Sequence, residues 1–468
     1  MLRGKQMRVA FATLLALVTT AASAADGPWA SFLEPLVSRE RLPPGRYGIE
    51  FRELRSGKLL FSDGAENLLN PASTIKVLTS AAALSKLGPD FRFKTLVSKS
   101  GNDLCLIGRG DPSLVDETMW LLVEEARRKG VQKIAGDLIA DDSYFPATRD
   151  HGIEFEGDGE RAFTAPIGAL STNFNSLTIH AEPTEIGQPP RLFLDPELPL
   201  FRLRNRARTA PNAVKGDLSA SIDRSGDSFV VTVGGKVSAR TERMTIYRAV
   251  PDPAIYAAAL FAEHFRRAGG TIAGKIRGGV CPATAAPLFE FSSKPLSHVV
   301  FDLNKFSNNF IAEMILRSIG DKPEPESGLR TMRDWLPAHG IPAPGVVVEN
   351  GSGLSRKTRI SARMIVEILR AASTDLKVAP EFLSSFGIAG IDGTLHRRFV
   401  GTPAESRLRA KSGSLSGVIS LAGVLQIPDG IEVAFCTLFN APSKPNWDLQ
   451  KLEERLILAI FAGKNVLK

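Results

Sequence analysis

Strand-like patterns at the two ends of the chain, separated by most of its length, constrain the fold more than any other feature. Near the beginning, apolar and polar residues alternate over 47–52, and a second apolar run follows at 59–61. Near the end, three further strand-like stretches follow one another: one that begins at Ser406, 418–425 and 431–439. If these segments join, they form a five-stranded antiparallel sheet with a large insertion between its two halves.

The last expected element is a helix with one apolar face. Its apolar residues recur at spacings of three, four and seven: Leu449, Leu452, Leu456, Ile457, Ile460 and Phe461. The opposite face mixes Glu453 and Glu454 with Lys451 and Arg455 instead of being uniformly basic. This pattern favours packing on the sheet over contact with a membrane surface.

The insertion contains two similar units. A helical pattern over 123–129 leads into the strand-like run 134–139, and a second helical pattern over 257–267 leads into 272–276. Both runs begin with Ile-Ala-Gly. Between the units, residues 192–250 are rich in Thr, Val, Arg, Gly and Ser and show no strong helical pattern. We expect a β-rich subdomain nested inside an α/β insertion.

The first 24 residues have the layout of a secretory signal peptide. Three basic residues precede an apolar run from Val9 to Val18, which is too short to span a bilayer, and small residues end at Ala24. We expect cleavage after Ala24 and export to the periplasm. Loss of the three basic residues lowers the net charge from +8 to 8 − 3 = +5, a mild basic excess that suits an anionic wall or membrane surface, with at most peripheral membrane contact. Export argues against a nucleic-acid partner.

Cysteine and histidine usage gives no sign of a metal. Cys105, Cys281 and Cys436 lie far apart without a CxxC pair, so at most one disulfide can form, and buried thiols are the favoured alternative. The six histidines show no HExxH or HxH spacing. We expect neither a metal nor a cofactor.

Ser73 and Lys76 lie one helical turn apart at the start of a helix that is expected to end at Gly88. Apolar neighbours and the positive end of the helix dipole favour the neutral form of the lysine, and a neutral amine can act as a base toward the serine hydroxyl. An SxxK pair by itself is weak evidence, because it occurs by chance about once or twice in a chain of this length.

Two further motifs follow in order. Ser307-Asn308-Asn309 precedes an apolar-striped helix, where helix capping explains it as well as catalysis does. Lys411-Ser412-Gly413 ends a strand-like segment, and its glycine permits close approach of an extended substrate. A cation and a hydroxyl at this strand edge suit a substrate carboxylate, and an exposed turn is the alternative.

The three motifs together resemble those of the penicillin-binding proteins and serine β-lactamases. The long separation of Ser73 from Ser307 is similar to that in the low-molecular-mass class C penicillin-binding proteins, the D-alanyl-D-alanine carboxypeptidase/endopeptidases.

The departures from the family pattern are small. Ser412 stands where the family usually has Thr, Asn308 stands where Asp is common, and Asn350 stands where Asp usually precedes Gly-Ser-Gly. Five other segments look like this family: 110–114 (GDPSL), 136–145 (GDLIADDSYF), 165–175 (APIGALSTNFN), 350–356 (NGSGLSR) and 390–395 (GIDGTL).

The resemblance implies an α+β fold of the penicillin-binding-protein and serine β-lactamase type, in which helices flank a five-stranded antiparallel sheet that carries a large α/β and β-rich insertion. The expected parts are a signal peptide at 1–24, a discontinuous catalytic domain at 25–88 and 291–468, an inserted domain at 89–165 and 245–290, and a nested β-rich subdomain at 166–244.

The resemblance also implies a role for each site residue. Ser73 would be the acylated nucleophile, Lys76 its base and Ser307 a proton relay to the leaving amine. Asn309 would bind a substrate amide, while Lys411, Ser412 and Gly413 would hold the terminal carboxylate and the strand edge. The backbone N–H groups of Ser73 and Ser414 would form the oxyanion hole. Asp142, with Tyr144, would border a pocket for the free end of a peptide side chain; surface-turn residues are the alternative.

These residues imply a serine DD-peptidase that forms an acyl-enzyme with peptidoglycan peptides ending in D-Ala-D-Ala and that β-lactams inhibit covalently. Endopeptidase cleavage of cross-links extends this expectation. Two alternatives remain at this point: a serine β-lactamase, against which the long insertion argues, and a wall-binding protein with a decayed site, against which the intact motifs argue.

Overall fold

The two ends of the chain meet in one sheet, as the sequence predicts. The computed structural model describes residues 25–146, 161–214 and 217–462, so the expected signal peptide lies outside the described residues. In the order in which they pair, all antiparallel, the strands of this sheet are β17 (Gly387–Ile388), β18 (Leu408–Leu415), β19 (Val418–Gln426), β20 (Glu432–Asn440), β1 (Tyr47–Glu53) and β2 (Leu59–Asp63).

Five of these strands are the predicted ones, and their register explains the alternation in the sequence. Phe51 of β1 lies opposite Phe435 of β20, and the two rings stack at 5.7 Å on one face of the sheet. Alternate residues of the same strands, among them Cys436, point to the other face. The edge strand β17 was not predicted, because two residues are too few to show a period.

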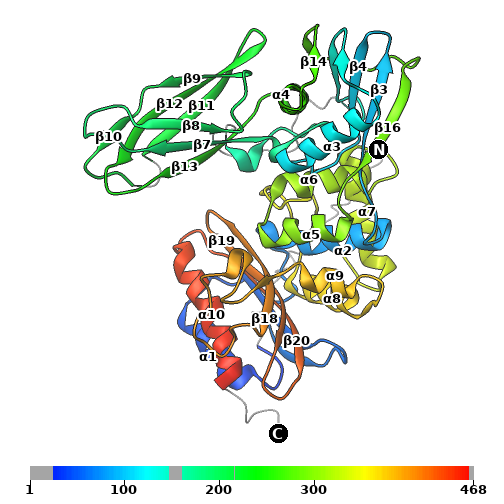
Figure 1. The fold of residues 1–468 in the computed structure, drawn as a ribbon. Helices are drawn as coiled ribbons and strands as arrows, with labels where there is room; N and C mark the ends of the chain where they lie inside the picture. The colour runs from blue at the N-terminus through cyan, green and yellow to red at the C-terminus, as the bar shows by residue number, and fades with distance from the viewer. Residues whose placement is uncertain (1–24, 147–160, 215–216, 463–468) are drawn as a thin grey trace, which may run out of the picture.

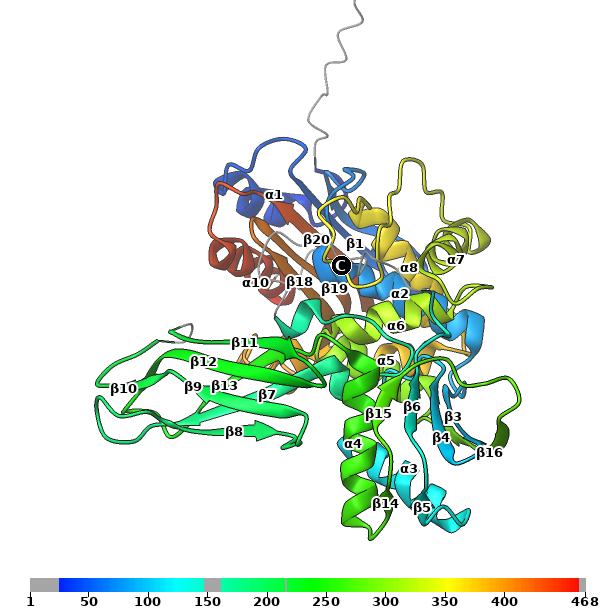
Figure 2. The same ribbon diagram turned by 90° about the horizontal axis from the view of Figure 1, so that it is seen from above.

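Helices cover both faces of this sheet (Figures 1 and 2). On one face, α10 (Asn446–Ala462) packs on β19 and against α1 (Ala30–Arg39), and the six predicted apolar residues of α10 are buried. This confirms that the tail helix packs on the sheet. The other face and the core behind it are formed by α2 (Lys76–Leu87), α5 (Leu296–Lys305), α6 (Asn309–Ser318), α7 (Pro325–Ala338), α8 (Ala362–Thr374) and α9 (Ala379–Ser384).

The two similar units of the insertion pair with each other. The parallel partners are β5 (Lys133–Ile134) with β14 (Thr271–Ile272) and β6 (Leu138–Asp141) with β15 (Ile276–Gly278). The helices that precede them, α3 (Asp116–Arg128) and α4 (Pro253–Arg267), contact each other. The sheet of the insertion, in pairing order, is β15, β6, β4 (Asp103–Gly108), β3 (Lys94–Ser100) and β16 (Ala286–Ser292).

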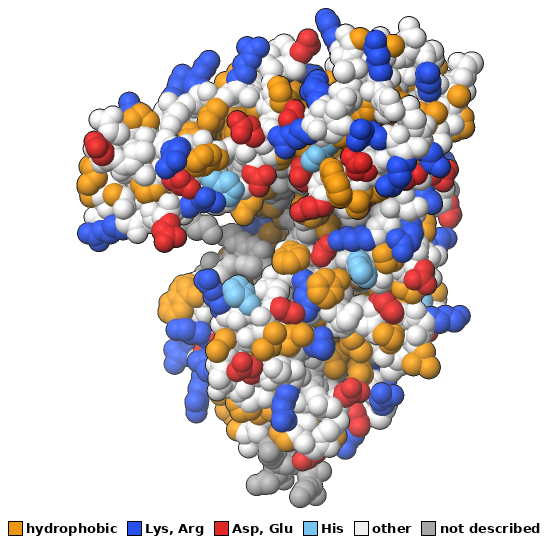
Figure 3. Space-filling view, in the orientation of Figure 1, with side chains coloured by type: hydrophobic (Ala, Val, Ile, Leu, Met, Phe, Trp, Pro, Cys, Tyr) orange, Lys and Arg blue, Asp and Glu red, His pale blue; other side chains and the backbone are white. Residues whose placement is uncertain are grey.

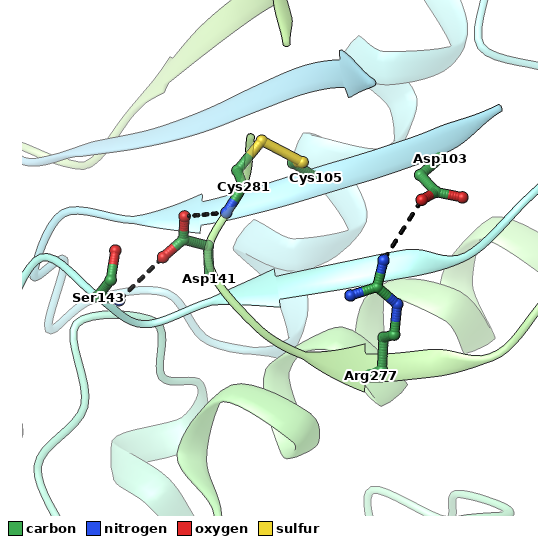
Figure 4. Close-up of a disulfide and its surroundings, with 6 residues drawn as sticks. All are labelled: Asp103, Cys105, Asp141, Ser143, Arg277 and Cys281. Carbon is green, nitrogen blue, oxygen red and sulfur yellow. Dashed lines mark hydrogen bonds and ion pairs between the residues drawn. A yellow bond between two sulfur atoms is a disulfide. The ribbon is translucent and has the colours of Figure 1, made fainter. Parts of the chain in front are cut away.

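A disulfide between Cys105 of β4 and Cys281, just after β15, corrects the expectation of buried thiols for these two residues (Figure 4). The sequence spacing could not show it, because 176 residues separate the pair and only the parallel pairing of β4, β6 and β15 brings them together. Cys436 is a buried free thiol.

The nested region consists of strands, as expected, and projects to one side of the molecule (Figure 1). One small sheet contains β13 (Met244–Ala249), β7 (Ser176–Glu182) and β8 (Arg191–Asp195). The other contains β10 (Arg208–Ala210), β12 (Ser228–Ser238), β11 (Leu218–Ser225) and β9 (Phe201–Asn205). The molecular surface is hollowed beneath this projection, and Lys and Arg lie among Asp and Glu across much of the same face (Figure 3). In the described part of the chain, no helix is long and apolar enough to cross a membrane.

Candidate active site

The first motif lies where a 3₁₀ turn, η1 (Ala72–Ile75), runs directly into α2. Ser73 is in the turn and Lys76 begins the helix, so the two side chains are stacked on one face. Lys76 Nζ and Ser73 Oγ are hydrogen bonded at 3.0 Å. The same nitrogen donates to Asn309 Oδ1 at 2.8 Å and to the Ser352 carbonyl at 2.5 Å. The nucleophile and base expected from SxxK are therefore in contact.

The environment of Lys76 favours the neutral amine. Its side chain is fully buried, and burial lowers its pKa well below the ordinary value. The nearby charge of Lys411 lowers this pKa further, while the carboxylate of Glu313 opposes both effects. An unprotonated Nζ at hydrogen-bond distance from Ser73 Oγ can accept the hydroxyl proton when the oxygen attacks a carbonyl.

The structure divides the tasks of the second motif among its three residues. Asn308 caps α6, because its Oδ1 accepts a hydrogen bond from the Ile311 N–H at 3.0 Å. Ser307, which precedes it, has a positive φ of 55°, an uncommon conformation for a residue other than glycine. Ser307 and Asn309 contact the lysines of the other two motifs, so capping explains Asn308 alone.

The third motif lies on β18, which contacts η1. Lys411 is fully buried, and burial lowers its pKa to about 7. Its Nζ donates to Ser307 Oγ at 2.8 Å and to its neighbour's carbonyl, Ser412 O, at 2.6 Å. Each of the two serine hydroxyls is thus hydrogen bonded to a lysine: Ser73 to Lys76, and Ser307 to Lys411.

Position 413 needs a glycine because β18 passes very close to the backbone of Ser73. A Cβ atom at this position would lie 2.9 Å from Ser73 N, 2.8 Å from Pro71 O and 2.3 Å from Ser420 Oγ. No such contact is tolerated without movement of the backbone. The close approach places the strand edge beside the Ser73 N–H, as an oxyanion hole that shares donors from η1 and β18 needs.

A cavity of about 530 Å³ opens over these groups. Ser73, Ser307, Asn309 and Ser414 all line it, so residues from all three motif regions face one space. The remaining lining residues are Phe163, Leu354, Arg356, Leu415, Ser416 and Asn446.

Asp142 lies in the insertion, where its side chain is held by the backbone of a neighbouring segment. Its Oδ1 accepts a hydrogen bond from the Leu170 N–H at 2.6 Å, and it is not among the residues that line the cavity. Burial raises its pKa to about 7. Tyr144 lies under the guanidinium of Arg109 at 4.9 Å and lines a separate cavity of about 310 Å³. The proposed side-chain contact of Asp142 therefore stays a prediction.

Two residues that complete the site were not singled out from the sequence. The Ser352 carbonyl accepts a hydrogen bond from Lys76, and its own N–H donates to the buried carboxylate of Glu313 at 2.9 Å. The Thr394 hydroxyl accepts one from Ser412 Oγ at 2.8 Å. Both lie in segments that resemble the family, 350–356 and 390–395, and that resemblance is the signal by which they could have been found.

Cofactor and metal sites were also sought. Over the ranges that the structure describes, no group of three or more His, Cys, Asp or Glu residues could hold a metal ion.

Comparison with known proteins gives consistent matches over most of the chain. A family model, that of the D-Ala-D-Ala carboxypeptidase 3 (S13) family, matches residues 30–456. A D-alanyl-D-alanine carboxypeptidase of Actinomadura sp. (strain R39) is 34% identical over 425 residues, which cover 85% of this chain and 78% of the relative. The D-alanyl-D-alanine carboxypeptidase DacB of Haemophilus influenzae is 27% identical over 446 residues, which cover 90% and 91%.

Solved structures show the same fold. The crystal structure of penicillin binding protein 4 (dacB) from Haemophilus influenzae has a TM-score of 0.77 at 24% identity and covers 92% of this chain and 99% of its own. The same protein complexed with a β-lactam has a TM-score of 0.73 at 23% identity, with the same coverage.

Proposed function

The chain belongs to the D-Ala-D-Ala carboxypeptidase 3 (S13) family and is a serine-type D-Ala-D-Ala carboxypeptidase, and from this premise we propose how its residues perform the reaction. The substrates are peptidoglycan peptides that end in D-Ala-D-Ala, and cross-linked peptides are cleaved by the same steps as an endopeptidase reaction. β-Lactams acylate the same serine. This assignment rests on the family, on the three motifs and on the geometry of the site.

Acylation begins with attack by Ser73 Oγ on the carbonyl carbon of the penultimate D-alanine. Lys76 Nζ accepts the hydroxyl proton, and the backbone N–H groups of Ser73 and Ser414 stabilise the developing oxyanion. The C–N bond then breaks, and Ser307 Oγ gives its proton to the leaving amine, which departs as D-alanine, while Ser307 is reprotonated by the proton that Lys76 took up. Water then gives a proton to the neutral Lys76 and attacks the ester, and the C–O bond breaks with that proton returned to Ser73 Oγ, which releases the shortened peptide.

Substrate orientation comes from the other motif residues. Asn309 binds a substrate amide from one side of the cavity, while Lys411 and Ser412 bind the terminal carboxylate from β18. Gly413 leaves room for the extended peptide along the strand. Lys411 has a second task, because its hydrogen bond to Ser307 Oγ holds the relay hydroxyl in the site.

One observation carries the assignment most strongly. The buried Nζ of Lys76, with its lowered pKa, lies 3.0 Å from Ser73 Oγ, and a second buried lysine holds the hydroxyl of Ser307 at 2.8 Å. A protein that only binds the wall needs no such pair of desolvated amines, each costly to bury. The intact geometry therefore favours a working enzyme over a decayed site.

Export belongs to the same proposal. Residues 1–24 carry the basic, apolar and small-residue segments of a signal peptide, and a peptidoglycan substrate lies outside the cytoplasm. N-terminal sequencing of the protein from a periplasmic fraction should begin at Ala25. A mature protein that retains Met1 would contradict this part of the proposal.

The reaction is tested by incubating the protein with benzylpenicillin and following its intact mass, together with D-alanine release from a D-Ala-D-Ala peptide. We expect a long-lived adduct on Ser73 and release of D-alanine, both lost in Ser73→Ala. Ser384→Ala, at the exposed end of α9, is the matched control and should behave as wild type. A short-lived adduct with rapid drug turnover would indicate a β-lactamase. D-Alanine release that persists in Ser73→Ala would overturn the mechanism.

A further inference from the structure

The hydroxyl proposed to bind the substrate carboxylate has a partner in a different loop. Ser412 Oγ and Thr394 Oγ1 are 2.8 Å apart and hydrogen bonded. Thr394 belongs to the short helix η4 (Gly393–Leu395), which contacts β18. Thr394 is half-buried, and neither it nor Ser412 is among the residues that line the cavity, but Ser412 lies on β18 two residues before Ser414, which does line it. Thr394 would therefore act on a substrate carboxylate through Ser412.

The loop that carries Thr394 is fixed to the loop that carries Ser307. Lys305 Nζ donates to both carboxylate oxygens of Asp392, at 2.8 Å and 2.6 Å, and the lysine side chain is only 3% exposed. Asp392 Oδ1 also accepts a hydrogen bond from the Ile388 N–H at 2.8 Å. The backbone of Gly393 packs so closely on Lys305 that a Cβ there would lie 2.9 Å from the Lys305 carbonyl oxygen. Thr394 is therefore held at a fixed distance from the site.

Proton counting shows what this hydroxyl pair does when a substrate arrives. A serine hydroxyl has one proton, and a carboxylate can only accept. While Ser412 donates to Thr394, its proton is not available to the substrate. When Ser412 donates to the carboxylate instead, its oxygen is free to accept, and the Thr394 hydroxyl can rotate and donate to it. The pair then stays hydrogen bonded in both states, with its direction reversed.

Resting on the proposed function, we propose that Thr394 is a positioning residue for carboxylate recognition. It holds the Ser412 hydroxyl in place in the free enzyme and donates to it in the complex, which strengthens Ser412 as a donor to the terminal carboxylate. The Lys305–Asp392 ion pair holds Thr394 at the distance that this exchange requires.

The proposal predicts an effect on carboxylate selectivity and not only on rate. The test compares kcat/KM for a D-Ala-D-Ala peptide with a free terminal carboxylate and for the same peptide with a terminal amide. Wild type should prefer the carboxylate. In Thr394→Val, which keeps the shape and removes the hydroxyl, kcat/KM for the carboxylate peptide should fall about tenfold, while that for the amide falls less than about twofold. Thr394→Ser should restore the preference.

Two controls separate positioning from a general loss of structure. Thr374→Val, at the exposed end of α8, removes a hydroxyl that donates to the Arg370 carbonyl and should leave both kcat/KM values unchanged. Active-site titration with benzylpenicillin gives the fraction of folded enzyme in each variant, and rates are expressed per titrated Ser73. If Thr394→Val does not fold, Thr394→Ala and Asp392→Asn are compared by the same selectivity ratio.

The outcomes distinguish this inference from the function on which it rests. A wild-type preference for the carboxylate that survives unchanged in Thr394→Val, or an equal loss for both peptides, would overturn the role of Thr394 alone. Equal kcat/KM values of the wild type for the two peptides would overturn carboxylate recognition by Lys411 and Ser412, and this inference with it. A loss confined to the carboxylate peptide supports both.

Discussion

Two buried lysines share the active site and need opposite protonation states. Lys76 must be neutral to accept a proton, and Lys411 must be charged to attract a carboxylate. The structure separates them, because the pKa of Lys76 is lowered well below its ordinary value by burial and by the charge of Lys411, whereas burial alone lowers that of Lys411 to about 7. The charge of Lys411 therefore helps to keep Lys76 neutral, and a neutral Lys76 places no second positive charge beside Lys411.

This arrangement predicts that kcat/KM decreases on both sides of an optimal pH, each decrease being due to a different lysine. Toward low pH, kcat/KM should fall as Lys76 gains a proton. Toward high pH, it should fall again as Lys411 of the free enzyme loses its proton near pH 7. Because a bound carboxylate stabilises the charged lysine, the alkaline limb of kcat should lie at higher pH than that of kcat/KM. Steady-state kinetics with the D-Ala-D-Ala peptide from pH 4 to 10 measures both limbs.

The peptide with a terminal amide is the control for this profile. It does not need the charge of Lys411 for binding, so its kcat/KM should show a weaker alkaline limb. Identical alkaline limbs for the two peptides would contradict the assignment of that limb to carboxylate binding.

At single positions, the sequence identifies residues that act through their side chains more readily than residues that act through a main-chain group. Ser73, Lys76, Ser307, Asn309 and Lys411 belong to short motifs and come together in the structure as expected. The Ser352 contribution is a carbonyl, which any residue possesses, so its identity gives no direct sign of the role. Thr394 lies in a segment that resembles the family, but its role was not assigned because its link to Ser412 is one hydroxyl contact formed by tertiary packing.

At the scale of elements, the site depends on contact between β18 and η1. No side chain separates them at Gly413, where the strand passes the backbone of Ser73 and Pro71. The helix α2 is anchored in turn, since its Ala-rich stretch is buried among α5, α6 and α8. The position of the nucleophile is thus set by one strand and one helix from distant parts of the chain.

Gly413→Ala tests this contact. The added methyl group must displace β18 from η1, which should cost about 1–3 kcal/mol of unfolding free energy. A shift of about 1 Å in the Ser73 N–H or the strand edge should lower the rate of Ser73 acylation by about 10²-fold. Thermal melting and the kinetics of benzylpenicillin acylation measure the two effects.

Gly234→Ala is the matched control, because Gly234 also lies within a strand, β12. A Cβ atom there would have its nearest neighbour, Ser219 Oγ, at an ordinary 3.6 Å. This variant should acylate at the wild-type rate. Wild-type acylation by Gly413→Ala would show that the strand edge does not need to approach the nucleophile so closely.

Elements with a long, regular pattern were predictable, and short or irregular ones were not. The apolar stripe of α10 reflects burial of one face, and in β1 the apolar Ile49 and Phe51 join one core cluster while Gly48 and Glu50 are buried on the other face; a period in the sequence records both patterns. In β9 and β10, which run parallel to β12, most side chains are partly or fully exposed, so no period marks them. Their existence follows from pairing with β12, which local sequence does not encode.

At the scale of the whole molecule, the insertion is a second folding unit with its own core. Residues of α3, α4 and strands of the inserted sheets, those of the nested region included, form one apolar cluster, separate from the two clusters that enclose the main sheet. The repeat of helix, turn and Ile-Ala-Gly predicted two similar units, and the structure shows why they are similar: they pair strand to strand. The order of the strands within the inserted sheets could not be predicted, because it depends on contacts between residues far apart in the chain.

The disulfide crosses this second unit and should stabilise it without taking part in catalysis. It joins β4 to the segment after β15, at a sequence separation of 176. Closing so long a loop strongly reduces the conformational entropy of the unfolded chain. The Cys281 N–H also donates to Asp141 at 2.7 Å, which fixes the end of β6 to the same segment. Replacing both cysteines in Cys105→Ala/Cys281→Ala should cost about 2–4 kcal/mol.

Calorimetry measures this loss as a lower temperature for the unfolding transition of the insertion. Acylation of Ser73 by benzylpenicillin at 25 °C should stay within about twofold of wild type, because the disulfide lies in a separate apolar unit from the motif residues. A reducing agent should lower the transition of the wild type and leave that of the double variant unchanged, since Cys436 is a free thiol in both. An unchanged transition would contradict the stabilising role. A parallel loss of acylation would show that the insertion and the catalytic domain form one cooperative unit, so that strain in the first is transmitted to Ser73.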